Sequence, residues 1–301
     1  MTLPFKIEQQ KNGFIGRFSA MASPCEILVD THIEQPSNYS SSQIEGMMER
    51  VYVEAKRIEQ KFSRYVKGNI VDQINSSENA PIYLDDETCK LLDFAFQCYE
   101  LSDGLFDISS GVLRKVWKFD GSDQVPSQKD ISPLLNNIGL NKLTWHKPEL
   151  ILPSAMELDF GGIGKEYAVD RCLQLATEHI KLPILINFGG DLACNGPRHN
   201  RQPWQVGIES VGGGEPAAIR LPHGALATSG DARRYLMKDG LRYSHILNPL
   251  TGCSVLNAPR SITIAAPTCI EAGLMSTMAM LQGSDAEAFL QQQNIPHWIQ
   301  A

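Results

Sequence analysis

The sequence lacks the features that mark membrane, secreted and nucleic-acid-binding proteins. No apolar run in its 301 residues approaches the roughly 20 residues that a membrane-spanning helix needs. Residues 1–10 contain neither an apolar core nor a small-residue cleavage site, so we expect no secretion signal. The net charge is −7 and no block of like charge occurs, which disfavours binding along a nucleic-acid backbone. We therefore expect a cytoplasmic protein, or a periplasmic or membrane-anchored one if a leader has been removed.

The cysteines form no recognisable spacing pattern. The seven cysteines are scattered, their number is odd, and none forms a CxxC pair. This pattern argues against both a disulfide framework and a zinc site. We expect most of these cysteines to be small buried apolar residues in a reduced compartment.

What is present is an ordinary globular composition, with 43% hydrophobic and 20% charged residues. The length is ample for a large core, either as one domain over residues 1–301 or as two halves in intimate contact. Apolar residues at three- and four-residue spacing predict amphipathic helices over residues 44–62 and 86–101, and a further helix is expected over residues 272–281.

Short apolar runs bounded by turn residues predict strands. The predicted strands are residues 14–20, 26–29, 150–152, 156–160, 184–188, 204–209, 218–221 and 261–266. The first two are expected to pair across a turn at Ser23-Pro24. Because strands and helices come in blocks with hairpins rather than in strict alternation, the predicted fold class is α+β, with antiparallel sheets and packed helices.

A glycine-rich turn lies between the strand-like residues 156–160 and a helical pattern that carries Tyr167. Asp159 and Lys165 bracket this turn with opposite charges, and Gly161-Gly162 lie within it. A strand, a glycine turn and a helix in this order can direct free backbone N–H groups at an anion. The alternative is a tight connection in which the glycines serve the backbone conformation only.

Two further turns carry glycine and acidic residues, at residues 188–191 (FGGD) and 228–231 (TSGD). Arg233-Arg234 and residues 244–249 (SHILNP) follow them, and together these segments favour a phosphate-rich ligand. His245 can be a general base or a ligand, although a lone histidine is more often structural. The aromatic residues beside polar groups suit a flat ring system, or they fill the core.

Eight sequence blocks occur in an order that resembles one known family. They are residues 21–26 (MASPCE), 62–65 (FSRY), 102–107 (SDGLFD), 158–165 (LDFGGIGK), 187–191 (NFGGD), 227–231 (ATSGD), 243–252 (YSHILNPLTG), and 271–272 (EA) with 276–277 (ST). The chain resembles the ApbE family, the FAD:protein FMN transferases, over nearly its whole length. The resemblance implies an ApbE-like, T-fold-like architecture. It also implies binding of FAD with Mg²⁺, and transfer of FMN to a Thr or Ser hydroxyl of a target protein while AMP leaves.

The resemblance also implies roles for particular residues. His245 matches a residue with a catalytic role. The residues implied in FAD binding are Met21, Tyr65, Leu105, Phe106, Asp107, Asp159, Lys165 and Ile246. For the metal, the resemblance implies the backbone carbonyl of Gly162 and the hydroxyl of Thr277, together with an aspartate. Mg²⁺ prefers such hard oxygen ligands, and it can neutralise phosphate charge during displacement at phosphorus.

The chain departs from the family pattern at two positions. The aspartate is expected four residues before the threonine, where this chain has Gly273, so the metal site lacks its main charged ligand. Glu271 lies about 200° round a helix from that position and is a poor substitute. The second departure is Glu166, where the family more often has a small residue. We expect an aspartate restored at position 273 to raise the affinity for Mg²⁺.

Three functions are consistent with these residues. The first is an active FMN transferase with a weakened Mg²⁺ site. The second is a flavin-binding protein that has lost transfer and acts as a carrier or regulator. The third is an FAD pyrophosphate hydrolase, in which water replaces the protein hydroxyl.

Overall fold

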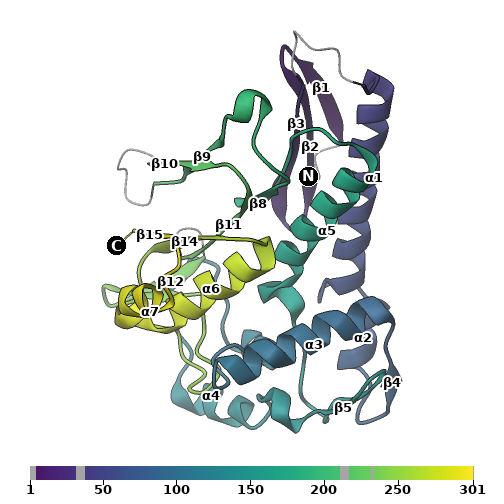
Figure 1. Cartoon of the computed structure of the whole chain (residues 1–301). Coiled ribbons are helices and arrows are strands. Elements are labelled where there is room, and N and C mark those ends of the chain that lie inside the picture. Colours follow the sequence, from purple (N-terminus) through teal and green to yellow (C-terminus); the bar gives the residue numbers. More distant parts are fainter. Residues whose placement is uncertain (1–4, 32–37, 211–216, 232–233, 301) are drawn as a thin grey trace.

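The computed structural model describes residues 5–31, 38–210, 217–231 and 234–300. In this part of the chain, an eight-stranded sheet has the strand order β1-β2-β3-β7-β8-β11-β14-β15 (Figure 1), and all its neighbouring strands pair antiparallel. The bounds are β1 (Lys6–Gln10), β2 (Gly13–Ala20), β3 (Ser23–Asp30), β7 (Ile184–Phe188), β8 (Asp191–Cys194), β11 (Gly224–Gly230), β14 (Ser261–Ala266) and β15 (His297–Gln300). The predicted α+β class with antiparallel sheets is confirmed.

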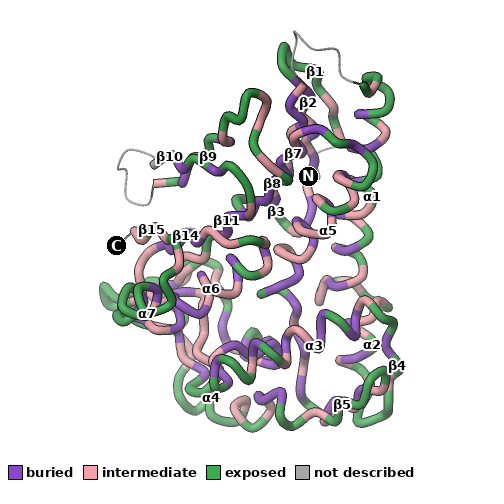
Figure 2. The backbone as a smooth tube through the Cα atoms, in the orientation of Figure 1, coloured by how far each residue is buried: buried purple, intermediate pink, exposed green. Residues whose placement is uncertain are grey.

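Three helices pack against this sheet: α1 (Ser41–Phe62), α5 (Gly164–His179) and α6 (Cys269–Leu281). In α1 the buried residues recur at helical spacing and include Met48, Ala55 and Phe62. A capping box formed by Ser40 and Gln43 starts this helix. α1 and α5 lie side by side (Figure 1), and the central strands β7 and β8 beneath the helices are almost wholly buried (Figure 2). The predicted helices over residues 44–62 and 272–281 are confirmed.

The opposite face of the sheet is covered by the hairpin β9 (Trp204–Ile208) and β10 (Ala217–Leu221). Successive side chains of a strand point to opposite faces. Accordingly, Ile184 and Ile186 of β7 belong to the main core, whereas Leu185 packs with Trp204 in a second, smaller core. The sheet is therefore buried on both faces at its centre. Its edge strand β1 is mostly exposed.

A third apolar cluster builds the part of the molecule that carries His245. It gathers Trp117, Ile131 and Leu236. The elements around it are η1 (Ile108–Lys115), α4 (Gln128–Leu135), β12 (Tyr235–Lys238) and β13 (Leu241–Ser244). The remaining elements are α2 (Ile70–Asn75), β4 (Ile82–Tyr83), α3 (Asp86–Leu101), η2 (Leu140–Lys142), β5 (Thr144–His146), β6 (Glu149–Ile151), η3 (Phe160–Gly162), η4 (His199–Arg201), η5 (Gly283–Asp285) and α7 (Ala286–Gln293). The predicted helix over residues 86–101 is confirmed as α3. Within the described ranges, no helix combines the length and apolarity needed to cross a bilayer.

Two local predictions are wrong. The β2–β3 turn lies at Met21 and Ala22, which both have positive φ, and Ser23-Pro24 already belongs to β3. Residues 156–159 are extended but pair with no strand. They are held instead by Asn75, whose side chain accepts a hydrogen bond from the Leu158 amide and donates one to the Leu158 carbonyl, at 2.7 and 3.0 Å. An apolar extended run predicts a strand, but here a side chain satisfies the backbone groups that a sheet would otherwise pair.

Candidate functional site

The glycine turn before α5 is organised around the Asp159 carboxylate. Its Oδ1 accepts a hydrogen bond from the Gly161 amide at 2.9 Å. Its Oδ2 accepts a hydrogen bond from Arg64 Nη1 at 2.9 Å, and Arg114 Nε lies 3.4 Å away. Gly111 must lack a side chain here, because a Cβ on it would lie 2.7 Å from Asp159 Cβ. Asp159 therefore positions two arginines from distant parts of the chain.

Those arginines line a cavity of about 400 Å³. Its lining consists of four cationic side chains, three aromatic rings and one histidine: Arg64, Arg114, Lys118, Arg234, Tyr65, Trp117, Phe119 and His245. Tyr65 is 79% exposed, and the Arg64 guanidinium lies 5.9 Å from the centre of its ring. Of the predicted site residues, Tyr65 and His245 thus come together. Cationic and aromatic side chains in one cavity suit a ligand that has both phosphates and flat rings.

His245 is neutral in this setting. Burial, with the Arg234 and Arg114 cations nearby, lowers the pKa of His245 to about 4. Its Nδ1 atom is buried and has no hydrogen-bond partner in the described part of the chain. The edge of the Phe119 ring packs against the imidazole, with 6.3 Å between ring centres. Since His245 also lines the cavity, its neutral imidazole is able to accept a proton from a ligand.

Lys165 lies in the first turn of α5 and forms an ion pair with Asp191 at the start of β8. Lys165 Nζ and Asp191 Oδ2 are 2.5 Å apart. The Thr228 amide donates to the other carboxylate oxygen of Asp191 at 3.0 Å. Burial lowers the pKa of Lys165, but the Asp191 and Glu166 carboxylates together outweigh burial and raise it. Lys165 is therefore a fixed cation at the N-terminal end of α5, where the helix dipole also favours an anion.

Gly162 and Thr277 are the predicted metal ligands. Gly162 is exposed at the end of η3, and η3 contacts α6, which carries Thr277. The Thr277 hydroxyl lies 3.0 Å from Ser229 Oγ. One turn earlier on α6, Gly273 is buried and offers no side-chain ligand. Among the described residues, no group of three or more His, Cys, Asp or Glu side chains could hold a metal. A metal here would depend on hard oxygen ligands, the kind that Mg²⁺ accepts.

The other residues predicted to contact FAD lie in several parts of the fold. Met21 is in the β2–β3 turn, where its amide donates to Glu59 Oε1 at 2.6 Å. Phe106 is buried, and its ring packs beside Gly162. The Asp107 carboxylate is buried and accepts hydrogen bonds from the Ser109 amide and hydroxyl. Leu105 and Ile246 are half-buried. Arg233 lies outside the described residues.

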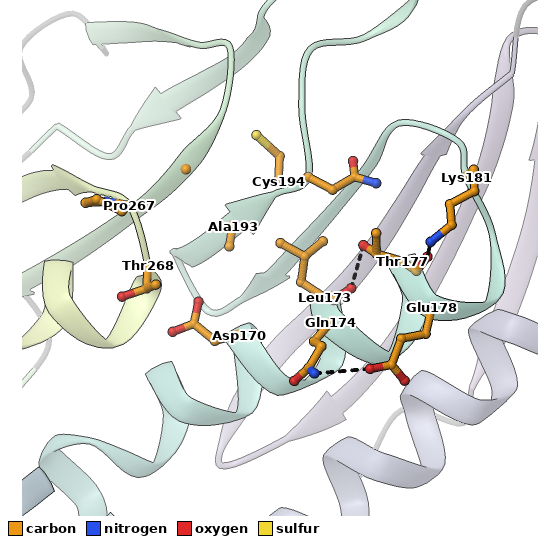
Figure 3. Close-up of a pocket in the computed structure, with 12 residues that line it drawn as sticks. Asp170, Leu173, Gln174, Thr177, Glu178, Lys181, Ala193, Cys194, Pro267 and Thr268 are labelled. Atoms are coloured by element: carbon orange, nitrogen blue, oxygen red, sulfur yellow. Dashed lines mark hydrogen bonds between the residues drawn. The ribbon is translucent and has the colours of Figure 1, made fainter.

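A second cavity of about 360 Å³ lies away from all of these residues. It is bounded by the C-terminal half of α5, by β8 and by the start of α6 (Figure 3). Leu173, Thr177 and Cys194 line it, and Asp170 and Thr268 lie at one end (Figure 3). Lys181 is the one cationic side chain among its lining residues, and none of them is aromatic. The first cavity is therefore the better candidate for a charged, ring-containing ligand.

Comparison with known proteins agrees with this geometry. The model of the ApbE family matches residues 21–299. The chain belongs to the ApbE family. Among curated relatives, the FAD:protein FMN transferase of Haemophilus influenzae is 26% identical over 86% of this chain and 77% of its own, and that of Escherichia coli is 27% identical over 79% and 72%. The crystal structure of the ApbE protein of Thermotoga maritima superposes with a TM-score of 0.84 at 28% identity, covering 98% of this chain and 94% of that one. The Pseudomonas stutzeri flavinyl transferase ApbE, at 24% identity and a TM-score of 0.81, shares the fold.

Sequence reasoning missed several residues of this candidate site. Arg64 lies in the quoted block 62–65, and its position beside Tyr65 was the available signal. Arg114, Trp117 and Phe119 lie in no motif, and only the tertiary structure brings them beside His245. Asp191 closes the block 187–191, but its ion pair with Lys165 joins α5 to β8 and has no local signal.

Proposed function

We propose that this protein is an FAD:protein FMN transferase, which moves FMN from FAD to a Thr or Ser hydroxyl of a target protein and releases AMP. The observation that carries the proposal is the neutral His245 on the wall of a cationic and aromatic cavity. The names of the relatives from Haemophilus influenzae and Escherichia coli support the same activity.

In the proposed reaction the acceptor hydroxyl oxygen attacks the phosphorus on the FMN side of the FAD pyrophosphate. The bond from that phosphorus to the bridging oxygen breaks, and AMP leaves with the bridging oxygen. The hydroxyl proton passes to the neutral His245 imidazole. Arg64, Arg114 and Arg234 neutralise the phosphate oxygens, on which negative charge must be stabilised during transfer.

The proposal retains all the residues predicted to contact FAD. Tyr65 offers an exposed ring at the cavity, and Asp159 acts by holding Arg64 and Arg114. Lys165 offers a fixed cation at the start of α5. The remaining proposed contacts, around the glycine turn and at the β2–β3 turn, are Met21, Leu105, Phe106, Asp107 and Ile246.

The residues present fit a magnesium ion in their donor chemistry. The Gly162 carbonyl and the Thr277 hydroxyl would hold it, and both are hard oxygen donors. When bound, Mg²⁺ neutralises charge on the phosphate oxygens and helps to orient them.

The direct test is to incubate the purified protein with FAD, Mg²⁺ and a target domain that has an acceptor Thr or Ser. Covalent flavin fluorescence on the denatured target supports transfer. Release of AMP and FMN with an unlabelled target indicates a hydrolase instead. Tight FAD retention with no product indicates a flavin carrier, and it contradicts the proposed transfer.

Tyr65→Ala is expected to weaken FAD binding. Aromatic contacts are worth about 0.5–1.5 kcal/mol beyond the area that they bury, so the Kd for FAD should rise about two- to tenfold. The measurement is flavin fluorescence quenching on titration of the protein into FAD. Tyr83→Ala is the matched control, because Tyr83 is 69% exposed and does not line the cavity. Equal FAD affinity in the parent and in Tyr65→Ala removes Tyr65 from the site.

A further inference from the structure

The two departures from the family pattern, Gly273 and Glu166, meet in the structure. A Cβ built on Gly273 would lie 2.5 Å from Cγ of Glu166 and 3.0 Å from both Cδ and Oε1. The Glu166 side chain therefore fills the space that a side chain at position 273 would need. A carboxylate from α5 lies where a carboxylate from α6 would otherwise point.

The packing of α5 against α6 explains this meeting. The Asp170 carboxylate accepts hydrogen bonds from the first amides of α6, those of Cys269 and Ile270, at 2.8 and 2.9 Å. Asp170 accordingly lies beside the start of α6 (Figure 3). Glu166 is one turn earlier on α5, and Gly273 is one turn later on α6. The two helices are thus antiparallel where they meet, and their contacts recur once per turn.

The same four-residue spacing leads from Glu166 and Gly273 to the two proposed oxygen donors. Four residues before Glu166 is Gly162, and four residues after Gly273 is Thr277. Residues four apart on a helix share a face, so Thr277 projects from the face of α6 that meets Glu166. η3, which contains Gly162, contacts α6 directly. Glu166 and Thr277 thus lie on the same side of α6, and η3 with Gly162 contacts that helix.

The Glu166 carboxylate lacks the partner that a buried charge requires. Its Oε2 atom is buried and has no hydrogen-bond partner in the described part of the chain. The nearest cation, Lys165, is ion-paired with Asp191. Burial and the nearby Asp191 carboxylate raise the pKa of Glu166 well above its ordinary value. Buried carboxylates are normally paired, hydrogen-bonded or bound to a metal, and the unpartnered Oε2 atom has a free position for a metal.

We propose that Glu166 is the carboxylate ligand of a divalent cation, in place of the missing side chain at position 273, and that it acts with the Gly162 carbonyl and the Thr277 hydroxyl. The proposal deepens the proposed function, on which it rests for the role of the cation. Under this proposal the two departures from the family pattern compensate each other: the carboxylate that α6 lacks at Gly273 is supplied by Glu166 of α5. The expectation that an aspartate at 273 raises metal affinity then holds only once Glu166 is shortened, because the two side chains collide.

The test titrates Mn²⁺ into the purified full chain and measures free Mn²⁺ by electron paramagnetic resonance. Glu166→Gln keeps the shape of the side chain and removes its charge. We expect the Mn²⁺ affinity to fall at least about tenfold, since even the loss of an outer partner of a metal ligand costs about 10–100-fold. The double variant Glu166→Ala with Gly273→Asp returns the carboxylate to α6 and should recover binding. Glu178→Gln, on the same helix and away from the proposed ligands, should bind Mn²⁺ as the parent does.

A thermal melt separates a ligand from a space-filling residue. Mn²⁺ should raise the melting temperature of the parent but not that of Glu166→Gln, which should itself fold because it removes an unpaired buried charge. Parent-like Mn²⁺ affinity in Glu166→Gln, or no Mn²⁺ binding by the parent, overturns the proposal. FAD affinity, measured in parallel without metal, tests the proposed function separately. If the parent does not bind FAD, the proposed function is wrong. The Mn²⁺ titration still shows whether Glu166 is a metal ligand.

Discussion

Replacing His245 by asparagine is expected to lower the rate of FMN transfer about 10²–10⁴-fold, the usual contribution of a positioned general base. Asparagine keeps a polar side chain in the cavity but cannot take the acceptor's proton. Because the phosphate-binding cations and Tyr65 remain, the Kd for FAD should stay within about twofold of the parent's value. The measurement is single-turnover labelling of the target, beside an FAD titration of the same protein.

His223→Asn is the matched control, since His223 is exposed and lies outside the cavity. It should label the target at the parent rate. If His245→Asn loses FAD affinity and rate together, His245 is a binding residue rather than the base. A parent-like rate contradicts any chemical role for it.

The acid limb of the parent's pH–rate profile tests the same assignment. A base must be unprotonated, and the pKa of His245 is lowered from an ordinary 6.5 to about 4. The transfer rate should therefore hold through pH 6.5 and fall only as the pH approaches about 4. In His245→Asn the residual rate should lack this limb. Linkage runs in the same direction: the neutral imidazole favours the folded state fully above pH 6.5, and that contribution is lost as the pH falls from 6.5 through about 4.

The parts of the fold that the sequence predicts are those set by local patterns. α1 and α3 follow from apolar residues at helical spacing, and β9 and β10 lie where short apolar runs predict strands. The extended segment at residues 156–159 shows the limit of such patterns. Its apolar run resembles a strand, but the Asn75 side chain, 83 residues away, satisfies the Leu158 backbone, and the Asp159 amide donates to the Ile108 carbonyl. A contact of that kind has no signal in the segment itself.

The candidate site divides in the same way. The motif blocks that carry the family resemblance point to Tyr65, Asp159, Lys165 and His245. They say nothing of Arg114 and Phe119, which reach the cavity only because η1 and the segment after it fold against the β12–β13 hairpin. Nor can they show that Glu166 fills the space beside Gly273. Each substitution on its own resembles the loss of a family feature, and their connection depends on the packing of two helices.

Lys165→Met is expected to lower the free energy of unfolding by about 3–5 kcal/mol, the usual cost of breaking a buried ion pair from one side. The Asp191 side chain is only 3% exposed, so methionine leaves its charge buried beside Glu166 with no cation in contact. Urea unfolding of the parent and the variant without FAD or metal measures the loss. Lys67→Met is the control, because the Lys67 side chain of the Lys67–Asp72 ion pair is solvent-exposed. Breaking that pair should lower the free energy of unfolding by at most about 1 kcal/mol.

The pH dependence of that loss identifies its cause. Without Lys165, the pKa of Glu166 in the folded variant should rise further, because burial and the Asp191 carboxylate raise it and the Lys165 cation is what lowers it. A group whose folded pKa is raised stabilises the folded state below the unfolded pKa, and that stabilisation disappears as the pH rises through the folded value. The variant should therefore approach the parent's stability in acid and fall furthest behind it above neutral pH. A deficit that stays constant with pH would mean that Lys165 acts through packing of its methylene chain, and the ion pair with Asp191 would then not be what holds α5 to β8.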